Sequence, residues 1–179
     1  MQCYYTFHSI QFDIQFDKTG YQRFLREQGL SEHDIKHLNI LFITDFTCSH
    51  FKGCVDLAAG GAFFQRGREY VEQENKKTLG LYRPVDPPGE YAAIFLRPAA
   101  MYFSSSRLNH TFLHETRHHI QHCLKLPSCS TVHPRVANEA HSARNQPWEI
   151  DAEEFADEYF RSHTFLQLVP HHLQRSDLR

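Results

Sequence analysis

The chain of 179 residues has no stretch approaching the roughly 20 consecutive apolar residues that a membrane-spanning helix needs. It also lacks an excess of charge of one sign, because 19 Lys and Arg nearly balance 21 Asp and Glu and leave a net charge of -2. This balance gives no electrostatic reason to expect nucleic-acid or anionic-membrane binding. The first residues contain neither the basic nor the apolar segment of a secretion signal. We therefore expect a soluble, cytoplasmic protein that binds neither membranes nor nucleic acid.

Internal repeats, low-complexity tracts and a Pro- or Gly-rich linker long enough to separate two domains are absent as well. The length is typical of one domain. A hydrophobic content of 41%, with 15 Phe and 8 Tyr, supplies enough apolar surface for a core and excludes disorder over most of the chain. We predict one domain over residues 1–165 and a polar C-terminal tail over residues 166–179.

The five cysteines are an odd number in a chain too large to need disulfide bonds, so reduced thiols are expected. Some of them could form a separate structural zinc site with nearby histidines. The residues concerned are Cys48, His50, Cys54, Cys123, Cys129 and His133. Their spacing is not the C-x2-4-C pattern of such sites, which disfavours this hypothesis.

The N-terminal part of the chain shows both strand and helix patterns. Apolar and polar residues alternate over residues 4–16, which predicts one long or two short strands. Residues 21–38 predict two short helices that are broken near Gly29, with Ser31 as the N-cap of the second. The run ILFITDF at residues 40–46 predicts a buried strand.

The second half of the chain predicts two longer helices. Residues 58–90 are polar and rich in Gly and Pro, so we expect a loop there, with a hairpin as the alternative. The apolar run from Tyr91 to Leu96 predicts a strand. A helix is expected from about Arg107 to Leu124, after the N-cap candidates Ser104 to Ser106, and a second from Trp148 to about Phe165.

The first of these helices contains an HExxH sequence, formed by His114, Glu115 and His118. Histidines at positions i and i+4 project from one helical face, so both imidazoles can reach a single zinc ion. The glutamate beside the first histidine can then reach a water on the metal. In a chain of this composition about 0.07 such matches are expected by chance, which favours metal binding.

The helical phase of the two histidines agrees with this interpretation. At 100° per residue from His114, the apolar residues Leu113, Ile120 and Leu124 fall between about 240° and 280°. His114 and His118 fall at about 0° and 40° and therefore flank the core-facing stripe. A second packed element could complete a site at that position.

A catalytic zinc site normally has three protein ligands, so a third must be found. The metzincin pattern HExxHxxGxxH is excluded, because position 121 is Gln and position 124 is Leu. The helix after Pro147 is rich in acids, and helical angles place Glu149 and Asp151 on opposite flanks of its apolar stripe. Either of these two carboxylates could be the third ligand.

The segments FLHETRHHIQ (residues 112–121) and PWEIDAEEFADEY (residues 147–159) resemble the small zincin-like metallopeptidases of gluzincin type, including the ImmA/IrrE-like proteases. The resemblance extends over about residues 80–160. It implies an α+β, zincin-like single domain with a small mixed sheet and two packed metal-bearing helices. The edge strand of that sheet would be the strand from Tyr91 to Leu96.

The resemblance also implies roles for individual residues. His114, His118 and Glu149 would be zinc ligands and Glu115 the general base, which places Glu149 before Asp151. The expected activity is that of a zinc metallopeptidase acting on a peptide or protein substrate through a Glu-activated water. The alternative is a catalytically silent zincin scaffold, which would serve as a metal-stabilised binding or toxin-type interaction module.

Several further residues are assigned supporting roles. Glu153 is expected to contact the ligand shell one turn from Glu149, and Arg117 is expected to pair with an acid of the second helix. His110 and His122 continue the histidine ladder and are expected to be solvated or to lie outside the ligand set. The candidates for stabilising an oxyanion are Tyr159, His163 and His141.

Overall fold

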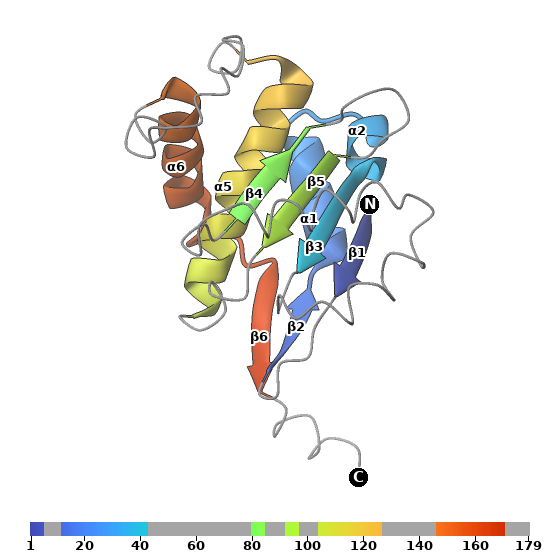
Figure 1. Ribbon diagram of the computed structural model, residues 1–179, viewed down its shortest axis with the longest axis vertical. Coiled ribbons are helices and arrows are strands. Elements are labelled where there is room, and N and C mark those ends of the chain that lie inside the picture. The colour runs from blue at the N-terminus through green and yellow to red at the C-terminus, as the bar shows by residue number, and fades with distance from the viewer. Residues whose placement is uncertain (6–11, 43–79, 85–91, 97–103, 127–145, 171–179) are drawn as a thin grey trace, which may run out of the picture.

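The computed structural model describes residues 1–5, 12–42, 80–84, 92–96, 104–126 and 146–170 (Figure 1). These residues form a mixed sheet, a separate two-stranded sheet and four helices, so the prediction of an α+β fold is confirmed. Among the described helices, none combines the length and apolar character that crossing a membrane requires.

The larger sheet has four strands in the order β1-β3-β5-β4. Strands β1, β3 and β5 are parallel, with Ile40 of β3 opposite both Cys3 and Ile94, whereas β4 is antiparallel to β5. The strands of this sheet are β1 (Gln2–Tyr5), β3 (Leu38–Phe42), β4 (Gly80–Arg83) and β5 (Ala92–Leu96).

The position of the edge strand differs from the prediction. The strand expected at the edge, from Tyr91 to Leu96, corresponds to β5, which lies between β3 and β4. Ala92, Ile94 and Leu96 are all buried, and a continuous apolar run is typical of an internal strand covered on its faces. Among the described strands, β4 takes the outer position beside β5. It lies in the region for which a hairpin was the alternative to a loop.

The boundary of the C-terminal tail also differs. Helix α6 (Pro147–Tyr159) ends earlier than expected, and β6 (Leu166–Pro170) forms an antiparallel pair with β2 (Phe12–Phe16). Phe165 and Leu166 are buried in the core. The predicted tail over residues 166–179 therefore begins with a strand of the folded domain, and its residues 171–179 lie outside the described part of the chain.

The N-terminal helices have clear end signals, of which the break near Gly29 and the cap at Ser31 were predicted and the start of the first helix before residue 21 was not. Helix α1 (Lys18–Glu27) begins after Asp17, whose side chain accepts a hydrogen bond from the amide of Gly20. Gly29 follows α1 with a φ of 89°, a conformation that favours glycine. Helix α2 (Glu32–Lys36) is capped by Ser31 in a capping box with Asp34.

Helix α5 (Ser105–Leu124) is central to the structure, because it packs against β4 and β5 and also against α6. Its apolar side chains Leu108, Phe112, Leu113 and Ile120 are buried in the core. The buried Asn109 ties this helix to the start of β6. It accepts hydrogen bonds from the amides of residues 165 and 166 at 2.9 and 2.8 Å. The core therefore fixes α5, with its outer face directed toward α6.

Candidate metal centre

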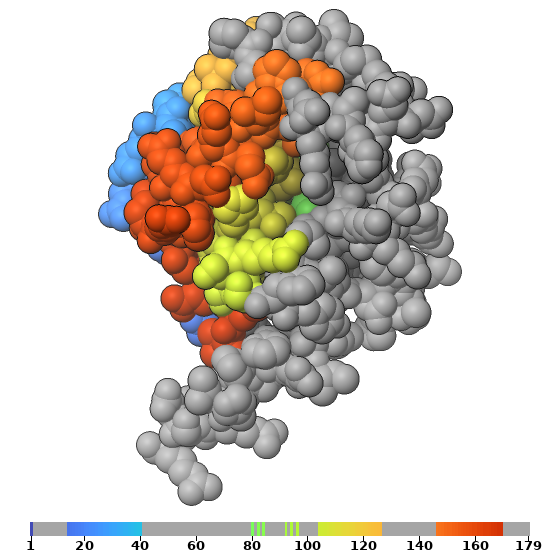
Figure 2. All heavy atoms as spheres, turned by 90° about the vertical axis from the view of Figure 1, so that its left-hand side faces the viewer, coloured from blue at the N-terminus to red at the C-terminus, as the bar shows by residue number. Residues whose placement is uncertain are grey.

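The centre lies between α5 and α6, which pack side by side at the surface shown in Figure 2. His114 and His118 lie one turn apart on α5, and Glu149 lies in the first turn of α6. Their side chains are 18%, 15% and 29% exposed, so the centre is partly buried but open to solvent. Among the described residues, these three form the one group of His, Cys, Asp or Glu arranged to hold a metal ion.

The distances within this group fit tetrahedral coordination. The Nε2 atoms of His114 and His118 are 3.2 Å apart, and Glu149 oxygens lie 3.2 and 3.5 Å from these two nitrogens. A tetrahedral ion with bonds of about 2.1 Å requires ligand atoms about 3.4 Å apart. The 3.2 Å distance involves Oε2 of Glu149 and the 3.5 Å distance involves Oε1, and one donor atom from each of the three residues lies within 4.8 Å of the others. The three side chains could therefore hold one ion after a small adjustment.

The outer nitrogen of each imidazole has its own hydrogen-bond partner. Nδ1 of His114 lies 3.1 Å from a carboxylate oxygen of Glu153, and Nδ1 of His118 lies 2.9 Å from Oε1 of Gln121. A partner on Nδ1 orients the ring and leaves Nε2 for a metal, an arrangement common in metal sites. Glu153, one turn from Glu149 on α6, therefore contacts the outer nitrogen of His114, as its spacing predicts.

The charges of the three side chains are strongly coupled. Burial lowers the pKa of His114 and of His118, but the hydrogen bonds to Glu149 and the charge of Glu115 outweigh burial and raise both pKa values overall. Burial alone would raise the pKa of Glu149, but the two histidines hold it far below its usual range. Glu149 is therefore an ionised carboxylate, which is the form that binds a cation.

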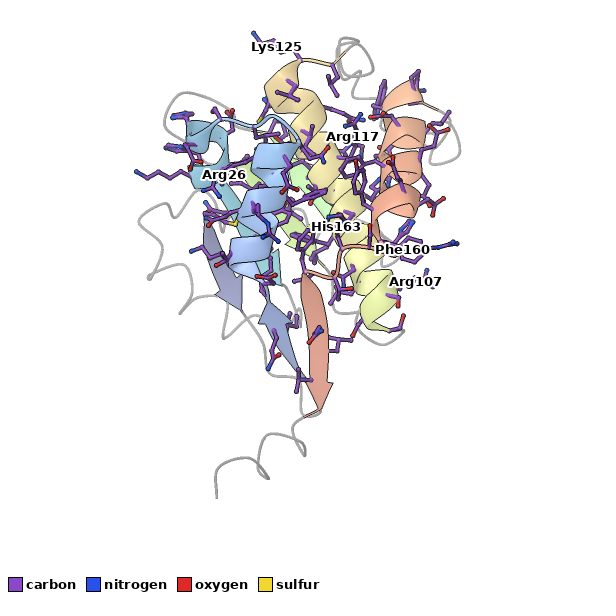
Figure 3. The ribbon with its side chains drawn as sticks, turned by 180° about the vertical axis from the view of Figure 1, so that it is seen from behind. Arg26, Arg107, Arg117, Lys125, Phe160 and His163 are labelled. Carbon is purple, nitrogen blue, oxygen red and sulfur yellow. The ribbon has the colours of Figure 1, made fainter. Side chains whose placement is uncertain are left out.

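Asp151, the other candidate for the third ligand, has different partners. Its carboxylate accepts two hydrogen bonds from Arg117, at 2.7 and 2.9 Å, and a third from Gln121 at 2.6 Å. The hydrogen bonds from Arg117 are the main cause of the lowered pKa of Asp151. Figure 3 shows Arg117 between α5 and α6, where its guanidinium also lies 4.9 Å from the centre of the Phe155 ring. The structure therefore places Asp151 in a helix–helix ion pair, outside the ligand group.

Glu115 lies on the side of α5 that faces β4 and is only 7% exposed. Burial is the main cause of its raised pKa, which the charges of His118 and His114 and a hydrogen bond from the backbone of Tyr82 partly offset. The carboxylate also lies against Gly80, where an added Cβ would be 2.7 Å from Cγ and 2.8 Å from Oε1 of Glu115. Strand β4 thus encloses the glutamate of the HExxH sequence.

The remaining candidates lie elsewhere or outside the described residues. His110 is 3.0 Å from Asp157, on the next turns of the same helix pair. Tyr159 lies ten residues beyond Glu149, about 15 Å along the helix, and packs with His163 around Phe24. Figure 3 shows His163 beyond the C-terminal end of α6. The structure does not bring either of these oxyanion candidates to the metal group. The other positions, all outside the described residues, are Cys48, His50, Cys54, Cys129, His133 and His141.

Sequence reasoning missed three residues that contact the site. Gly80 and Tyr82 lie on β4, and nothing in the local sequence links that strand to Glu115. Gln121 could have been found, because seven residues at 100° each place it about 20° from His114 on the helical wheel. At the level of sequence, Gln121 served only to exclude a metzincin pattern.

Comparison with protein-family models, with curated proteins and with solved structures found no match. The interpretation of the centre therefore depends on its donor atoms and on their surroundings. Two imidazoles, one ionised carboxylate and a neighbouring buried glutamate are the features from which a function can be argued.

Proposed function

We propose that the protein is a zinc-dependent metallopeptidase with a zincin-like fold of gluzincin type. The observation that carries the proposal is the convergence of His114, His118 and Glu149, each of which offers one donor atom within 4.8 Å of the other two. Two imidazole nitrogens and one carboxylate oxygen are a ligand set of catalytic zinc sites, in which three protein ligands leave a position for water or substrate. The partial exposure of all three side chains agrees with such an open position.

Zinc bound at this centre would lower the pKa of a coordinated water and polarise the scissile carbonyl group. In the proposed reaction, Glu115 accepts a proton from the attacking water and delivers it to the amine leaving group. Burial raises the pKa of Glu115, which suits a carboxyl group that must hold a proton between accepting it as a base and delivering it as an acid. The backbone hydrogen bond from Tyr82 and the contact with Gly80 restrict where this carboxylate can lie.

The second candidate function is a metal-stabilised interaction module without catalytic activity. The burial of Glu115 under β4 favours this alternative, because burial raises the pKa of Glu115 and so disfavours the ionised carboxylate that a general base requires. In that case the metal would only link α5 to α6.

Glu115→Gln distinguishes the two functions, because it preserves the size of the side chain and removes the base. New protein N-termini would be counted by mass spectrometry in a proteome incubated with zinc-loaded wild-type protein, with Glu115→Gln, and with the exposed control Glu154→Gln. Cleavage by the wild type and Glu154→Gln, together with loss of cleavage and normal zinc content in Glu115→Gln, is the expected result. Equal cleavage by Glu115→Gln, or none by the zinc-loaded wild type, would contradict the peptidase proposal.

A further inference from the structure

Behind the metal group, Gln121 connects α5 to the first turn of α6. Its side chain is almost fully enclosed, at 1% exposure. The amide nitrogen donates hydrogen bonds to the carbonyl oxygen of Trp148 at 2.9 Å and to Oδ2 of Asp151 at 2.6 Å. The amide oxygen lies 2.9 Å from Nδ1 of His118. The Gln121 amide therefore has three hydrogen-bond partners: the carbonyl of Trp148, the carboxylate of Asp151 and the imidazole of His118.

The chemistry of these partners decides the orientation of the Gln121 amide. A carbonyl oxygen and a carboxylate oxygen can only accept hydrogen bonds, so both must face the NH2 group. The oxygen of the amide must then face His118, and an oxygen can be approached closely only by a ring nitrogen that carries a hydrogen. The arrangement requires a proton on Nδ1 of His118.

Arg117 fixes the acceptor that determines this orientation. Its guanidinium binds both oxygens of Asp151, at 2.7 and 2.9 Å, in the fork geometry that suits a carboxylate. Asp151 is thereby held in place, with Oδ2 directed toward the Gln121 amide. Arg117, Asp151 and Gln121 form one hydrogen-bonded chain that ends at the imidazole of His118.

We infer that Gln121 is a positioning residue that holds the ring of His118 with Nδ1 toward its own amide oxygen and Nε2 toward the metal group. Nε2 then faces His114 and Glu149, so this nitrogen can bind an ion without rotation of the ring. This inference rests on the proposed metal function and extends it. It also gives Asp151 a role, as the residue that orients Gln121 rather than as a ligand.

The ring orientation can be measured in the zinc-loaded wild-type protein, which needs no variant that could fail to fold. Ring 15N shifts would be recorded by NMR, with His118 assigned by comparison with His118→Gln. We expect zinc on Nε2 of His118 and a hydrogen on Nδ1. Zinc on Nδ1, or a ring that exchanges between the two orientations, would overturn the inference.

The effect on metal binding can be measured with Gln121→Met, which has a similar length but no amide. Loss of the outer partner of a ligating histidine typically weakens metal binding by about 10–100-fold, and we expect a loss of zinc affinity in that range against a competing chelator. The control Glu154→Gln alters an exposed acid of α6 and should leave the affinity unchanged. Wild-type affinity in Gln121→Met would overturn the inference. Absence of zinc binding by the wild type would instead contradict the proposed function.

Discussion

Gly80→Ala gives a direct test of how β4 positions the glutamate of the HExxH sequence. The new methyl carbon would lie 2.7 Å from Cγ and 2.8 Å from Oε1 of Glu115, and 2.8 Å from Cγ2 of Thr111. Ordinary contacts between such atoms begin near 3.4 Å, so the side chains of Glu115 and Thr111 would have to move or β4 would have to shift away from α5. Thr111 and Glu115 lie one turn apart on α5, so the new methyl group would press on the same face of that helix at two places.

The expected effect of Gly80→Ala can be estimated from these contacts. Overpacking of this kind typically costs about 1–3 kcal/mol of unfolding free energy. Without the close contacts, the same substitution in a strand would stabilise the protein by about 0.5–1 kcal/mol, because glycine loses more backbone entropy on folding. The structure therefore predicts the sign of the change as well as its size.

Urea unfolding of the wild type, Gly80→Ala, Glu115→Ala and the double variant would measure the effect. We expect Gly80→Ala to destabilise the wild type and to cost clearly less in the Glu115→Ala background, where the two close contacts with Cγ and Oε1 of Glu115 are absent. In the proposed peptidase, cleavage should fall while zinc content is unchanged. A stabilising effect of Gly80→Ala, or the same cost in both backgrounds, would refute the placement of Glu115 against β4.

Three other substitutions or reactions test separate parts of the structure. Asn109→Ala would leave the buried amides of residues 165 and 166 without an acceptor. We expect the free energy of unfolding in urea to fall by about 2–4 kcal/mol, and a decrease below about 0.5 kcal/mol would be inconsistent with these contacts. Burial, together with nearby Asp34, raises the pKa of Cys123 to about 12. Alkylation of this thiol at pH 8, followed by peptide mass spectrometry, should therefore be about 10³-fold slower in the folded than in the unfolded protein. Comparable alkylation rates would contradict the burial of the thiol. Arg117→Ala should destabilise the protein by about 1–3 kcal/mol in thermal unfolding, because it leaves Asp151 without its cation. An unchanged thermal stability would show that the ion pair between α5 and α6 contributes little.

Local signals allowed much of the helical structure to be predicted. The cap at Ser104, the capping box of Ser31 and Asp34, and the stop near Gly29 all depend on residues within one or two turns. The two histidines share a face because of their spacing alone, and α6 begins at Pro147 as expected.

The strands were harder to predict, because pairing depends on segments that are distant in the sequence. The apolar run of β5 indicates a strand, but its internal position depends on β4, whose four residues carry little pattern of their own. Residues 166–170 were assigned to a tail, although they pair with residues 12–16 at the other end of the chain. No local signal identifies such a partner.

The same limit applies to the site. Helical angles reduced the third ligand to Glu149 or Asp151, but the choice depends on how α6 is rotated against α5. The structure places Glu149 beside both histidines and Asp151 beside Arg117. The pairing of the partly buried Arg117 guanidinium with Asp151 is a tertiary contact, which spacing alone does not indicate.

The central claim is that one metal ion binds between α5 and α6, and the most direct test is the zinc content of purified variants. Zinc per chain would be measured by mass spectrometry for the wild type, His114→Ala, His118→Ala, Glu149→Ala, Asp151→Ala and the exposed control Glu154→Ala. We predict about one zinc per chain in the wild type and in Glu154→Ala, weaker but detectable binding in Asp151→Ala, and loss of stoichiometric zinc in the two histidine variants and Glu149→Ala. Stoichiometric zinc that persists in both histidine variants would contradict the claim, as would loss of zinc in Asp151→Ala with normal binding in Glu149→Ala.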